Sequence, residues 1–400
     1  MINIKKKSLC CGCGACAQVC PKQCIMMAED NEGFLYPQVD KLKCIDCGLC
    51  DRVCPEMAAV EARKPLGVFA AKHQNEEIRK SSSSGGIFTL LAEKVLAEKG
   101  VVFGARFSEG WAVVHDYVET IEKLDSFRGS KYLQSVIGGN YKKAEQFLKE
   151  GRKVLFSGTP CQIAGLKKYL RKEYENLLTV DFVCHGVPSP KVWKIYLQDT
   201  VEKIAPQGDS RKNTVSTTSK NRLVLIGVDF RGKSTGWKKY SFTLHLAEAN
   251  AEGEKNTVSH SHPYYKNPFM QSFLADLILR PSCYECPSKA GRSGSDITIG
   301  DFWGIERLKP EIDDDRGLSL VLVHNPQYYS FIKDISLCEF EYRDAVGGNP
   351  SLEKSVARPL YRDVYMRKIL RKNRFVQYKP TRVIRFAERV RRVLKRKLGI

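Results

Sequence analysis

The sequence predicts an α+β protein in which a small cysteine-rich N-terminal domain precedes a larger α/β body and a basic C-terminal helix. Three observations predict this class: a cysteine run that occurs twice before residue 60, alternating strand-like and helix-like segments after residue 66, and a strongly basic end. The 400 residues are 42% hydrophobic, which is enough for a sizeable core and for more than one domain.

The N-terminal domain, residues 1–60, contains two copies of one cysteine spacing. Residues 10–21 read CCGCGACAQVCP and residues 44–55 read CIDCGLCDRVCP, and each copy contains the bacterial ferredoxin run C-x2-C-x2-C-x3-C-P. In two-cluster ferredoxins the last cysteine of each run binds the other cluster. The sequence therefore predicts two [4Fe–4S] clusters with crossed ligands. One has the ligands Cys10, Cys13, Cys16 and Cys54, and the other has Cys44, Cys47, Cys50 and Cys20.

Zinc and disulfides are the alternatives, and the sequence disfavours both. Zinc sites use CxxC pairs or cysteine with histidine, whereas here two complete quartets end in proline. Disulfides need an oxidising compartment, but the segment MINIKKKSLCC has neither the apolar region nor the cleavage site of a signal peptide. No apolar run in the sequence is long enough to span a bilayer. We therefore expect a cytoplasmic protein.

The body is expected in two parts, residues 66–150 and 151–365, after a linker bounded by prolines. Residues 80–100, KSSSSGGIFTLLAEKVLAEKG, predict a Ser/Gly loop that opens an amphipathic helix ending at Gly100, and two strands follow. The free backbone N–H groups of such a loop are suited to bind phosphate. A flexible N-cap without a ligand is the alternative.

Four cysteines of the body follow strands or form a CxxC pair. Cys161 lies where RKVLFSGTPCQIAGLKKYL passes from strand to helix, and Cys184 follows the strand in NLLTVDFVCHGVPSP. A helix N-terminus lowers the pKa of a thiol, which suits Cys161 to be a metal thiolate or a nucleophile. Cys283 and Cys286 form the pair in RPSCYEC, and the residues alone leave open a further cubane or buried core thiols with a small zinc or redox pair. Three further cysteines are interpreted as structural: Cys11, Cys24 and Cys338.

Six motifs carry a resemblance to a known family: SSGGIF, GSKYLQS, GTPCQIAGL, DFVCHGVPSP, RPSCYEC and SDITIGDFWG. They resemble the coenzyme F-420 hydrogenase/dehydrogenase beta-subunit family, and the chain is also similar to plant and cyanobacterial reductases of chlorophyll intermediates. The resemblance implies an iron–sulfur flavoprotein with FAD in the α/β body, and a third [4Fe–4S] cluster bound near the flavin by the four body cysteines. The positions that match the flavin site are Ser83, Ser84, Gly85, Gly86, Gly129, Ser130, Lys131, Gly158, Thr159 and Pro160.

Two residues are candidates for catalysis beside the flavin. Lys131 is a cation suited to stabilise a reduced isoalloxazine, and a surface lysine is the alternative. His185, next to Cys184, is a candidate proton donor, or else a capping or core residue. Asp301 and Trp303 of GDFWG either close the site or form a buried turn.

Residues 222–248 predict a hairpin with a basic turn. The turn either receives an anionic substrate or forms an edge with solubilising lysines. Its residues of interest are Lys233, Trp237, Lys238 and Lys239.

The net charge of +20 is concentrated in a tail predicted at residues 366–400. Residues 367–400 contain fourteen Lys and Arg and a single acidic residue, Glu388. After Pro380, apolar residues at roughly helical spacing predict a basic amphipathic helix that binds an anionic membrane surface or an acidic partner. The alternative is a terminal helix that packs on its own domain. No recognised nucleic-acid-binding module accompanies the charge, so no specific nucleic acid is expected.

Together these features predict an iron–sulfur, flavin-dependent oxidoreductase. Electrons are expected to pass from a redox partner protein or ferredoxin through the clusters and FAD to a small-molecule acceptor such as coenzyme F-420, or in the reverse direction. One alternative is an electron-transfer subunit that has no substrate of its own. Another is a reductase of cell-surface polysaccharide metabolism, peripheral on the inner face of the membrane.

Overall fold

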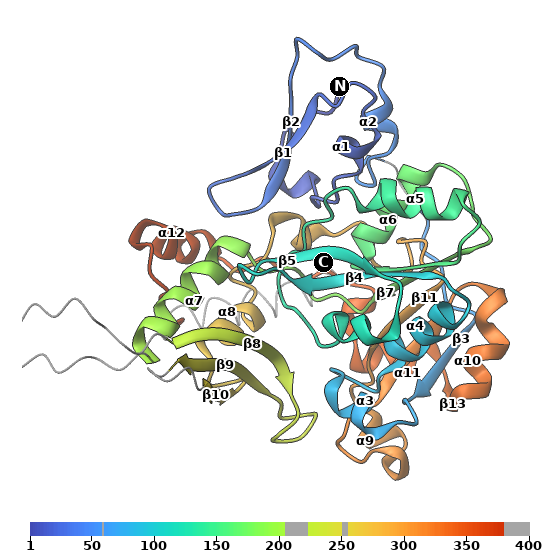
Figure 1. Ribbon diagram of the computed structural model, residues 1–400, viewed down its shortest axis with the longest axis vertical. Helices are drawn as coiled ribbons and strands as arrows, with labels where there is room; N and C mark the ends of the chain where they lie inside the picture. The colour runs from blue at the N-terminus through green and yellow to red at the C-terminus, as the bar shows by residue number, and fades with distance from the viewer. Residues whose placement is uncertain (58–59, 205–222, 250–254, 380–400) are drawn as a thin grey trace, which may run out of the picture.

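A computed structural model describes residues 1–57, 60–204, 223–249 and 255–379, and Figure 1 shows it as a ribbon. These residues form an N-terminal lobe, a body built on an eight-stranded sheet, and a smaller β lobe built on a three-stranded sheet. The predicted α+β class, with a small cysteine-rich domain before a larger α/β body, is confirmed.

The N-terminal lobe contains two similar halves, in agreement with the repeat in the sequence. Each half has a short helix that carries a cysteine and follows a glycine with left-handed backbone, Gly14 at φ 74° and Gly48 at φ 70°. An antiparallel pair of strands, joined by a turn at residues 30–34, lies between the halves. The elements of the lobe are η1 (Lys7–Leu9), α1 (Ala15–Val19), β1 (Ile25–Glu29), β2 (Leu35–Val39) and α2 (Leu49–Arg52).

The body sheet has the strand order β13-β3-β12-β11-β7-β6-β4-β5. Neighbouring strands from β11 to β4 are parallel, and the outer pairs are antiparallel. Because parallel strands end at the same edge of a sheet, the loops that follow them gather there. The strands are β3 (Gly67–Ala71), β4 (Val101–Phe107), β5 (Val113–Val118), β6 (Val154–Gly158), β7 (Leu177–Phe182), β11 (Ile297–Asp301), β12 (Ser319–Val323) and β13 (Ser336–Phe340).

Helices cover both faces of this sheet, because its central strands are apolar on both sides. α4 and α10 pack on one face, and α5, α6 and α11 pack on the other. The helices of the body are α3 (Glu76–Ser81), α4 (Ile87–Ala97), α5 (Asn140–Lys149), α6 (Pro160–Leu170), α9 (Ile305–Leu308), α10 (Tyr329–Ile335) and α11 (Tyr342–Gly348). Its 3-10 turns are η2 (Ile121–Phe127), η4 (Pro310–Ile312), η5 (Pro326–Tyr328) and η6 (Pro350–Leu352).

The helix predicted within residues 80–100 has different ends in the structure. Ser81 belongs to the preceding helix α3, and α4 ends at Ala97 rather than at Gly100. Gly86 stands directly before α4 with φ 89°, and this left-handed backbone turns the loop into the helix at a position where other residues are strained.

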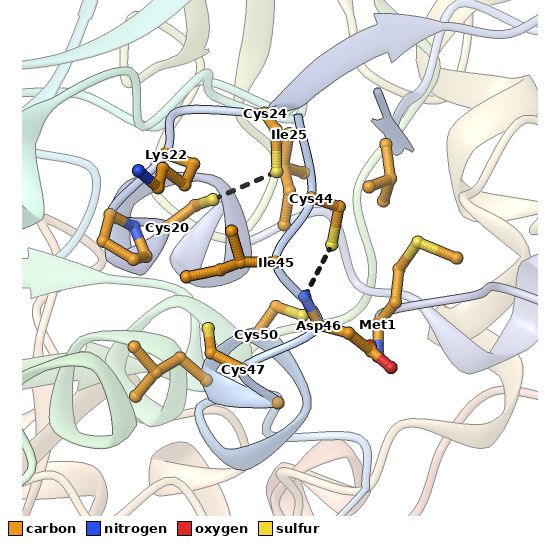
Figure 2. A pocket seen from close by; sticks show the side chains of 14 residues that line it. Met1, Cys20, Lys22, Cys24, Ile25, Cys44, Ile45, Asp46, Cys47 and Cys50 are labelled. Atoms are coloured by element: carbon orange, nitrogen blue, oxygen red, sulfur yellow. Dashed lines mark hydrogen bonds and ion pairs between the residues drawn. The ribbon is translucent and has the colours of Figure 1, made fainter. Parts of the chain in front are cut away.

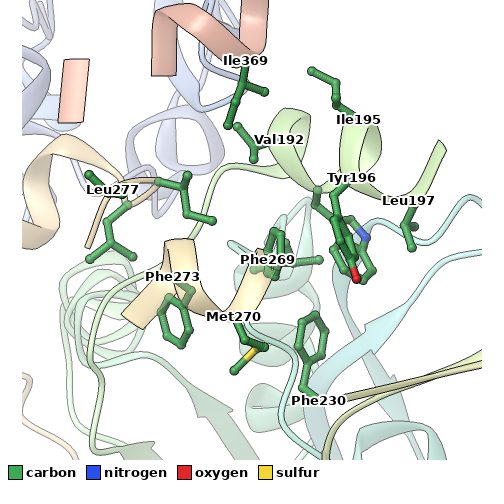
Figure 3. Packing of buried hydrophobic residues seen from close by; sticks show 14 of the residues in the cluster. Val192, Ile195, Tyr196, Leu197, Phe230, Phe269, Met270, Phe273, Leu277 and Ile369 are labelled. Carbon is green, nitrogen blue, oxygen red and sulfur yellow. The ribbon is translucent and has the colours of Figure 1, made fainter. Parts of the chain in front are cut away.

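The β lobe encloses an aromatic core between its sheet and three helices. Phe230 of β8 packs against Trp193 of α7 and Phe269 of α8, with ring centroids 5.2 Å and 6.0 Å away. Figure 3 shows this cluster, with Ile369 of α12 facing Val192 of α7. The elements are α7 (Pro190–Ile204), β8 (Leu223–Gly232), β9 (Ser241–Ala249), β10 (Lys255–Pro263), α8 (Pro268–Leu274), η3 (Pro281–Glu285) and α12 (Arg362–Lys372).

The boundary predicted at residue 366 falls inside helix α12. Tyr365, Met366 and Ile369 are buried in the aromatic core, so this helix belongs to the folded part of the chain. The amphipathic helix predicted after Pro380 lies outside the described residues. Among the helices that the structure describes, none is both long and apolar enough to cross a membrane.

Candidate functional site

The first cysteine set lies at the inner end of the N-terminal lobe, against the body. A Cβ added at Gly165 of α6 would lie only 2.9 Å from the Sγ of Cys13, so the helix touches the set directly. Burial raises the pKa of Cys16 to about 12, and the nearby thiols of Cys10 and Cys54 raise this pKa further. Cys54 thus lies beside cysteines of the other copy, as crossed ligands require. The first cysteine set comprises Cys10, Cys13, Cys16 and Cys54.

The second cysteine set lies at the outer end of the lobe and lines a pocket, which Figure 2 shows. Cys47 is exposed, and the exposed side chain of Ile45 stands beside it in the pocket wall. Backbone N–H groups point at two of the sulfurs: Asp46 donates to Cys44 at 3.4 Å and Ile2 donates to Cys50 at 3.2 Å. The second cysteine set comprises Cys44, Cys47, Cys50 and Cys20.

Cys24, interpreted from the sequence as structural, also lies in this pocket. Its Sγ is 3.4 Å from the Sγ of Cys20, and its thiol hydrogen-bonds with Cys44. The second cysteine set therefore has a fifth thiol within contact distance. The position of Cys24 four residues after Cys20 was the only sign of this in the sequence.

The body cysteine set is brought together from three separate segments. Cys161 begins α6, Cys184 follows β7, and the CxxC pair lies in and just after η3. Burial raises the pKa of Cys283, and the thiols of Cys184, Cys161 and Cys286 each raise it further, which places the four close together. The body cysteine set comprises Cys161, Cys184, Cys283 and Cys286.

The low pKa predicted for the thiol of Cys161 is wrong for the free thiol. Thr159 caps α6, and the helix N-terminus does point at Cys161. However, a hydrogen bond with Cys11 and burial raise the pKa of Cys161 well above its usual value. The neighbouring thiol and desolvation outweigh the helix dipole here, so without a bound metal Cys161 is a protonated thiol and a poor free nucleophile.

Cys11 joins the first cysteine set to the body cysteine set. Its thiol hydrogen-bonds with both Cys13 and Cys161. Its carbonyl accepts a hydrogen bond of 2.8 Å from the side chain of Gln134, in the GSKYLQS segment. A residue interpreted as merely structural therefore occupies the junction of the two regions.

Two buried cations stand beside the cysteines, and neither forms an ion pair with a carboxylate among the described residues. Arg280 is 1% exposed and donates to the carbonyl of Cys10 at 2.8 Å, and Lys289 is 5% exposed and donates to the carbonyl of Cys184. Within the part of the chain that the structure describes, no ion pair joins either one to Asp or Glu. Because an unpaired buried charge is costly, both cations fit thiolate-bound, anionic iron–sulfur clusters at these sets.

A single metal ion fits the cysteines less well. No group of three or more His, Cys, Asp or Glu among the described residues is close enough together to hold one ion. In a cubane each thiolate binds a different iron, so its four cysteines stand farther apart than the ligands of zinc do.

The candidate flavin loops meet at the GSKYLQS segment. The hydroxyl of Ser83 accepts hydrogen bonds from the N–H and the hydroxyl of Ser130, at 2.6 Å and 2.8 Å. Ser84 donates to the carbonyl of Leu318 at 2.8 Å, and the N–H of Gly85 donates to Ser319. Hydrogen bonds therefore hold the Ser/Gly loop between two segments.

Lys131 is a partly buried cation in the same place. Its Nζ donates to the carbonyls of Arg128 and Gly129, at 2.9 Å and 3.2 Å. Burial lowers the pKa of Lys131 to about 7, while the charge of Asp229 partly offsets this effect. A cation that lacks an ion pair among the described residues fits an anionic group such as a phosphate or a reduced isoalloxazine.

The turn at Gly158, Thr159 and Pro160 joins the GSKYLQS segment through Gln162. Thr159 and Gln162 form a capping box at the start of α6. The side-chain amide of Gln162 also donates to the hydroxyl of Ser135 at 2.9 Å. This turn and the Ser/Gly loop are thus connected by way of residues 129–135.

His185 is partly exposed and is oriented by a carboxylate. Its Nε2 lies 2.6 Å from Oδ1 of Asp276, and its ring meets Phe273 edge to face at 5.2 Å. Phe273 in turn packs on Tyr132, next to Lys131. The two candidate catalytic residues are therefore linked through a pair of aromatic rings.

The lysines of the predicted hairpin turn are mostly engaged within the protein. Lys233 donates to three backbone carbonyls, those of Arg79, Ser84 and Arg316, and Lys238 pairs with Asp313. Lys239 is exposed. Lys233 therefore ties the hairpin to the Ser/Gly loop, and this contact favours neither of the two interpretations made from the sequence.

Asp301 and Trp303 form part of a buried cluster with Arg231. Arg231 is 5% exposed and donates to both carboxylate oxygens of Asp301, at 2.9 Å and 3.2 Å. Trp237 donates to Asp301 at 2.8 Å and stacks on Trp303 with centroids 4.9 Å apart. These contacts fit the buried-turn interpretation, and Arg231 itself carried no distinguishing signal in the sequence.

Comparisons with known proteins identify the families to which the chain is similar. Two family models for the beta subunit of coenzyme F420 hydrogenase/dehydrogenase match the chain: the N-terminal model covers residues 68–137 and the C-terminal model covers residues 151–340. Residues 9–58 match a 4Fe-4S dicluster domain. A chain of the F420-reducing [NiFe] hydrogenase complex from Methanosarcina barkeri is 19% identical, with 78% of this chain and 91% of that chain covered and a TM-score of 0.41. No curated protein matches the sequence.

Proposed function

The chain belongs to the coenzyme F420 hydrogenase/dehydrogenase beta-subunit family and carries a 4Fe-4S dicluster domain, and from this premise we propose that it is an iron–sulfur flavoprotein. It moves electrons between a protein donor and a small organic acceptor, in either direction. Coenzyme F420 is the first candidate for the acceptor, because the family is named after it.

The contact between the two cysteine regions is the observation that carries this proposal. A single side chain, that of Cys11, hydrogen-bonds with a member of the first cysteine set and with a member of the body cysteine set. Iron–sulfur clusters transfer single electrons and a flavin takes up one or two, so together they connect a one-electron donor with a two-electron substrate. Residues that hold such groups side by side in the interior support a relay rather than a store of iron.

A third cluster at the body cysteine set is part of the proposal. Lys289 holds the carbonyls of Cys184 and Ser351, and it offers a positive charge to the thiolates. The N–H of Val187 points at the Sγ of Cys283 at 3.4 Å, and the N–H of Cys286 donates to Ser355. These groups fix the loops that present the sulfurs, as ligand loops of iron–sulfur proteins do.

FAD is proposed at the loops joined by the GSKYLQS segment. Ser83 and Ser130 hold two of these loops together, and Gly129, with φ 78°, has open space where its Cβ would stand. Lys131 would offer its ammonium to the anionic part of the cofactor. The hydrogen bond to Asp276 holds the ring of His185 in one orientation, which suits a residue that delivers a proton to a bound substrate.

A second candidate function is an electron-transfer subunit that passes electrons to a partner enzyme. The family models describe beta subunits, which favours a partner protein. The exposed Cys47 gives such a partner access to the second cysteine set. In that case the isolated chain reduces artificial dyes but no small-molecule substrate.

The deciding experiment is the content of iron, sulfide and flavin per chain after anaerobic reconstitution, together with turnover of reduced or oxidised coenzyme F420. About twelve irons with one flavin support three cubanes and the reductase. About eight irons without flavin contradict the flavoprotein and leave the N-terminal lobe as the redox-active part.

A further inference from the structure

We propose that Arg280 is a positioning residue that raises the reduction potential of the first cysteine set's cluster and holds this set against the body cysteines. The proposal goes beyond the proposed function in assigning a residue to the junction, and it rests on that function only for the presence of a cluster at the first cysteine set. Nothing in the sequence singled out Arg280, which stands at the start of RPSCYEC.

Arg280 reaches the first cysteine set with its whole guanidinium. Nε donates to the carbonyl of Cys10 at 2.8 Å, and Nη2 lies 3.7 Å from the Sγ of the same residue. A Cβ added at Gly12 would lie 2.7 Å from Nη1, so the ligand loop passes directly over the guanidinium. Nη2 also donates to the carbonyl of Leu35 at 2.9 Å.

The same residue belongs to the body cysteine loop through its backbone. The N–H of Arg280 donates to the carbonyl of Val187 at 2.9 Å, and its own carbonyl accepts from the N–H of Cys283 at 3.0 Å. Nη1 donates to Gln134 at 2.8 Å, and Gln134 in turn donates to the carbonyl of Cys11. Arg280 therefore connects the ligand loops of both cysteine regions.

Arg280 forms no ion pair with a carboxylate among the described residues. The carboxyl of Glu56 does respond to its charge: burial raises the pKa of Glu56 to about 7, and Arg280 partly offsets this rise. The hydrogen bonds of Arg280 go to carbonyls, an amide and a thiol, and its guanidinium lies 4.3 Å from the ring centroid of Tyr36. A cation buried in this way stabilises added negative charge nearby, and reduction adds one negative charge to a cluster. Hydrogen bonds to the sulfurs act in the same direction. The cluster of the first cysteine set is thus easier to reduce with Arg280 than without it.

Arg362 provides a matched control, because it fastens the same lobe without contacting a cysteine. It is 1% exposed and donates to both carboxylate oxygens of Glu32 in the turn at residues 30–34, at 2.7 Å and 2.6 Å. It also donates to the carbonyl of Leu279, the neighbour of Arg280. Its charge is neutralised by Glu32. An effect that comes only from looser docking should appear equally in variants of Arg362 and Arg280.

The test is an anaerobic redox titration monitored by electron paramagnetic resonance. It uses full-length protein carrying Cys47→Ala and Cys283→Ala, so that neither the second cysteine set nor the body cysteine set contributes a cluster signal. We compare Arg280→Gln, Arg280→Lys and Arg362→Gln in this background. Arg280→Gln should lower the equilibrium constant for reduction by about tenfold, which is about 59 mV for one electron. Arg280→Lys keeps the charge and should give a smaller shift in the same direction, and Arg362→Gln should give none.

Two outcomes overturn the proposal: an unchanged potential in both Arg280 variants, or an equal shift in Arg362→Gln. If Arg280→Gln does not assemble its cluster, the potential measured in Arg280→Lys is compared with that of Arg362→Gln instead. A lower potential in Arg280→Lys alone supports the proposal, and an unchanged one overturns it. Absence of the signal in the parent protein would instead contradict a cluster at the first cysteine set, and so it would count against the proposed function. The rate of protease cleavage within residues 60–66 measures independently how firmly the N-terminal lobe is docked on the body, because looser docking exposes this segment.

Discussion

The two cysteine sets of the N-terminal lobe share one spacing but have opposite surroundings. The first cysteine set is packed against α6, Cys11 and Arg280, whereas the second cysteine set faces outward with Cys47 exposed. Solvent exposure, nearby charge and hydrogen bonds to sulfur set the potential of an iron–sulfur cluster. The repeat therefore supplies two similar binding loops, and the rest of the fold gives them different roles. In the proposed relay, the outer set would exchange electrons with a partner protein and the inner set with the body.

The largest expected effect comes from removing one ligand of each set. Cys13→Ala and Cys47→Ala should each lower the iron content by about four per chain, because a cubane needs its four thiolates. Both variants should retain flavin. Cys13→Ala should stop electrons from dithionite-reduced partner protein from reaching the body, and Cys47→Ala should slow their arrival from the partner. Iron analysis and stopped-flow absorbance measure these changes.

Loss of flavin from both of these variants would contradict the separation of the lobe from the flavin site. An equal loss of all electron transfer in both would break the comparison between an outer and an inner set. Cys338→Ala, which lies on β13 far along the chain from both sets, is the matched control and should keep iron and flavin unchanged.

The next largest effect tests whether a second iron–sulfur cluster, bound by the body cysteine set, lies beside the inner set. Cys283→Ala should remove about four further irons per chain while both N-terminal signals remain in electron paramagnetic resonance. We expect spin coupling between the body cluster and the inner cluster to broaden the inner signal, and this broadening should disappear together with those irons. Unchanged iron content would rule out a cluster at the body cysteine set.

A smaller effect concerns the docking of the lobe itself. Arg362→Gln leaves the carboxylate of Glu32 without its partner in the interface, and breaking a buried pair in this way costs about 3 kcal/mol. Chemical denaturation followed by tryptophan fluorescence should detect the loss. Arg358→Gln removes an exposed ion pair with Asp363 and should cost less than about 1 kcal/mol. Equal losses of unfolding free energy in the two variants would contradict a stabilising ion pair between Arg362 and Glu32.

The smallest effect compares a glycine at each set. A Cβ at Gly165 would lie 2.9 Å from the Sγ of Cys13, so Gly165→Ala overpacks the inner interface and should cost about 2 kcal/mol. Gly48 has no atom within 4 Å of an added Cβ, and Gly48→Ala should cost only about 1 kcal/mol because its φ is 70°. Thermal unfolding should show a larger loss of stability in Gly165→Ala than in Gly48→Ala. A larger loss in Gly48→Ala would show that the inner set is not tightly packed.

The sequence predicted the N-terminal lobe well, because its information is local. Two tight loops of fixed spacing, together with the crossed-ligand rule of two-cluster ferredoxins, led to the expectation that Cys54 lies with the first copy and Cys20 with the second. The structure places Cys54 near Cys16 and Cys20 in one pocket with Cys44, and the ligand sets themselves stay a prediction. The Ser/Gly loop before α4 and the strand ends at Cys161 and Cys184 were also recognisable from apolar patterns.

The sequence could not predict how the lobe meets the body, because that depends on contacts between distant segments. Arg280 is 270 residues away from Cys10 along the chain, and its only local context is a CxxC pair. Cys11 lies outside the ferredoxin spacing and so gave no signal. The pKa of Cys161 was mispredicted for the same reason, since the helix N-terminus is visible in the sequence and the burial against Cys11 is not.

The ion pair between Glu32 and Arg362 also has a consequence for biosynthesis. These residues are 330 positions apart, so at the rate of translation the lobe leaves the ribosome roughly 15 to 65 s before its last docking partner. Arg280 and the CxxC pair are also made long after the lobe. Until α6 (Pro160–Leu170) is made, the first cysteine set has no body helix to cover it, and its sulfurs are accessible to the machinery that delivers iron and sulfide. The order of synthesis thus leaves time for the lobe to take up iron and sulfide before the last contact between lobe and body, that of Arg362 with Glu32, can form.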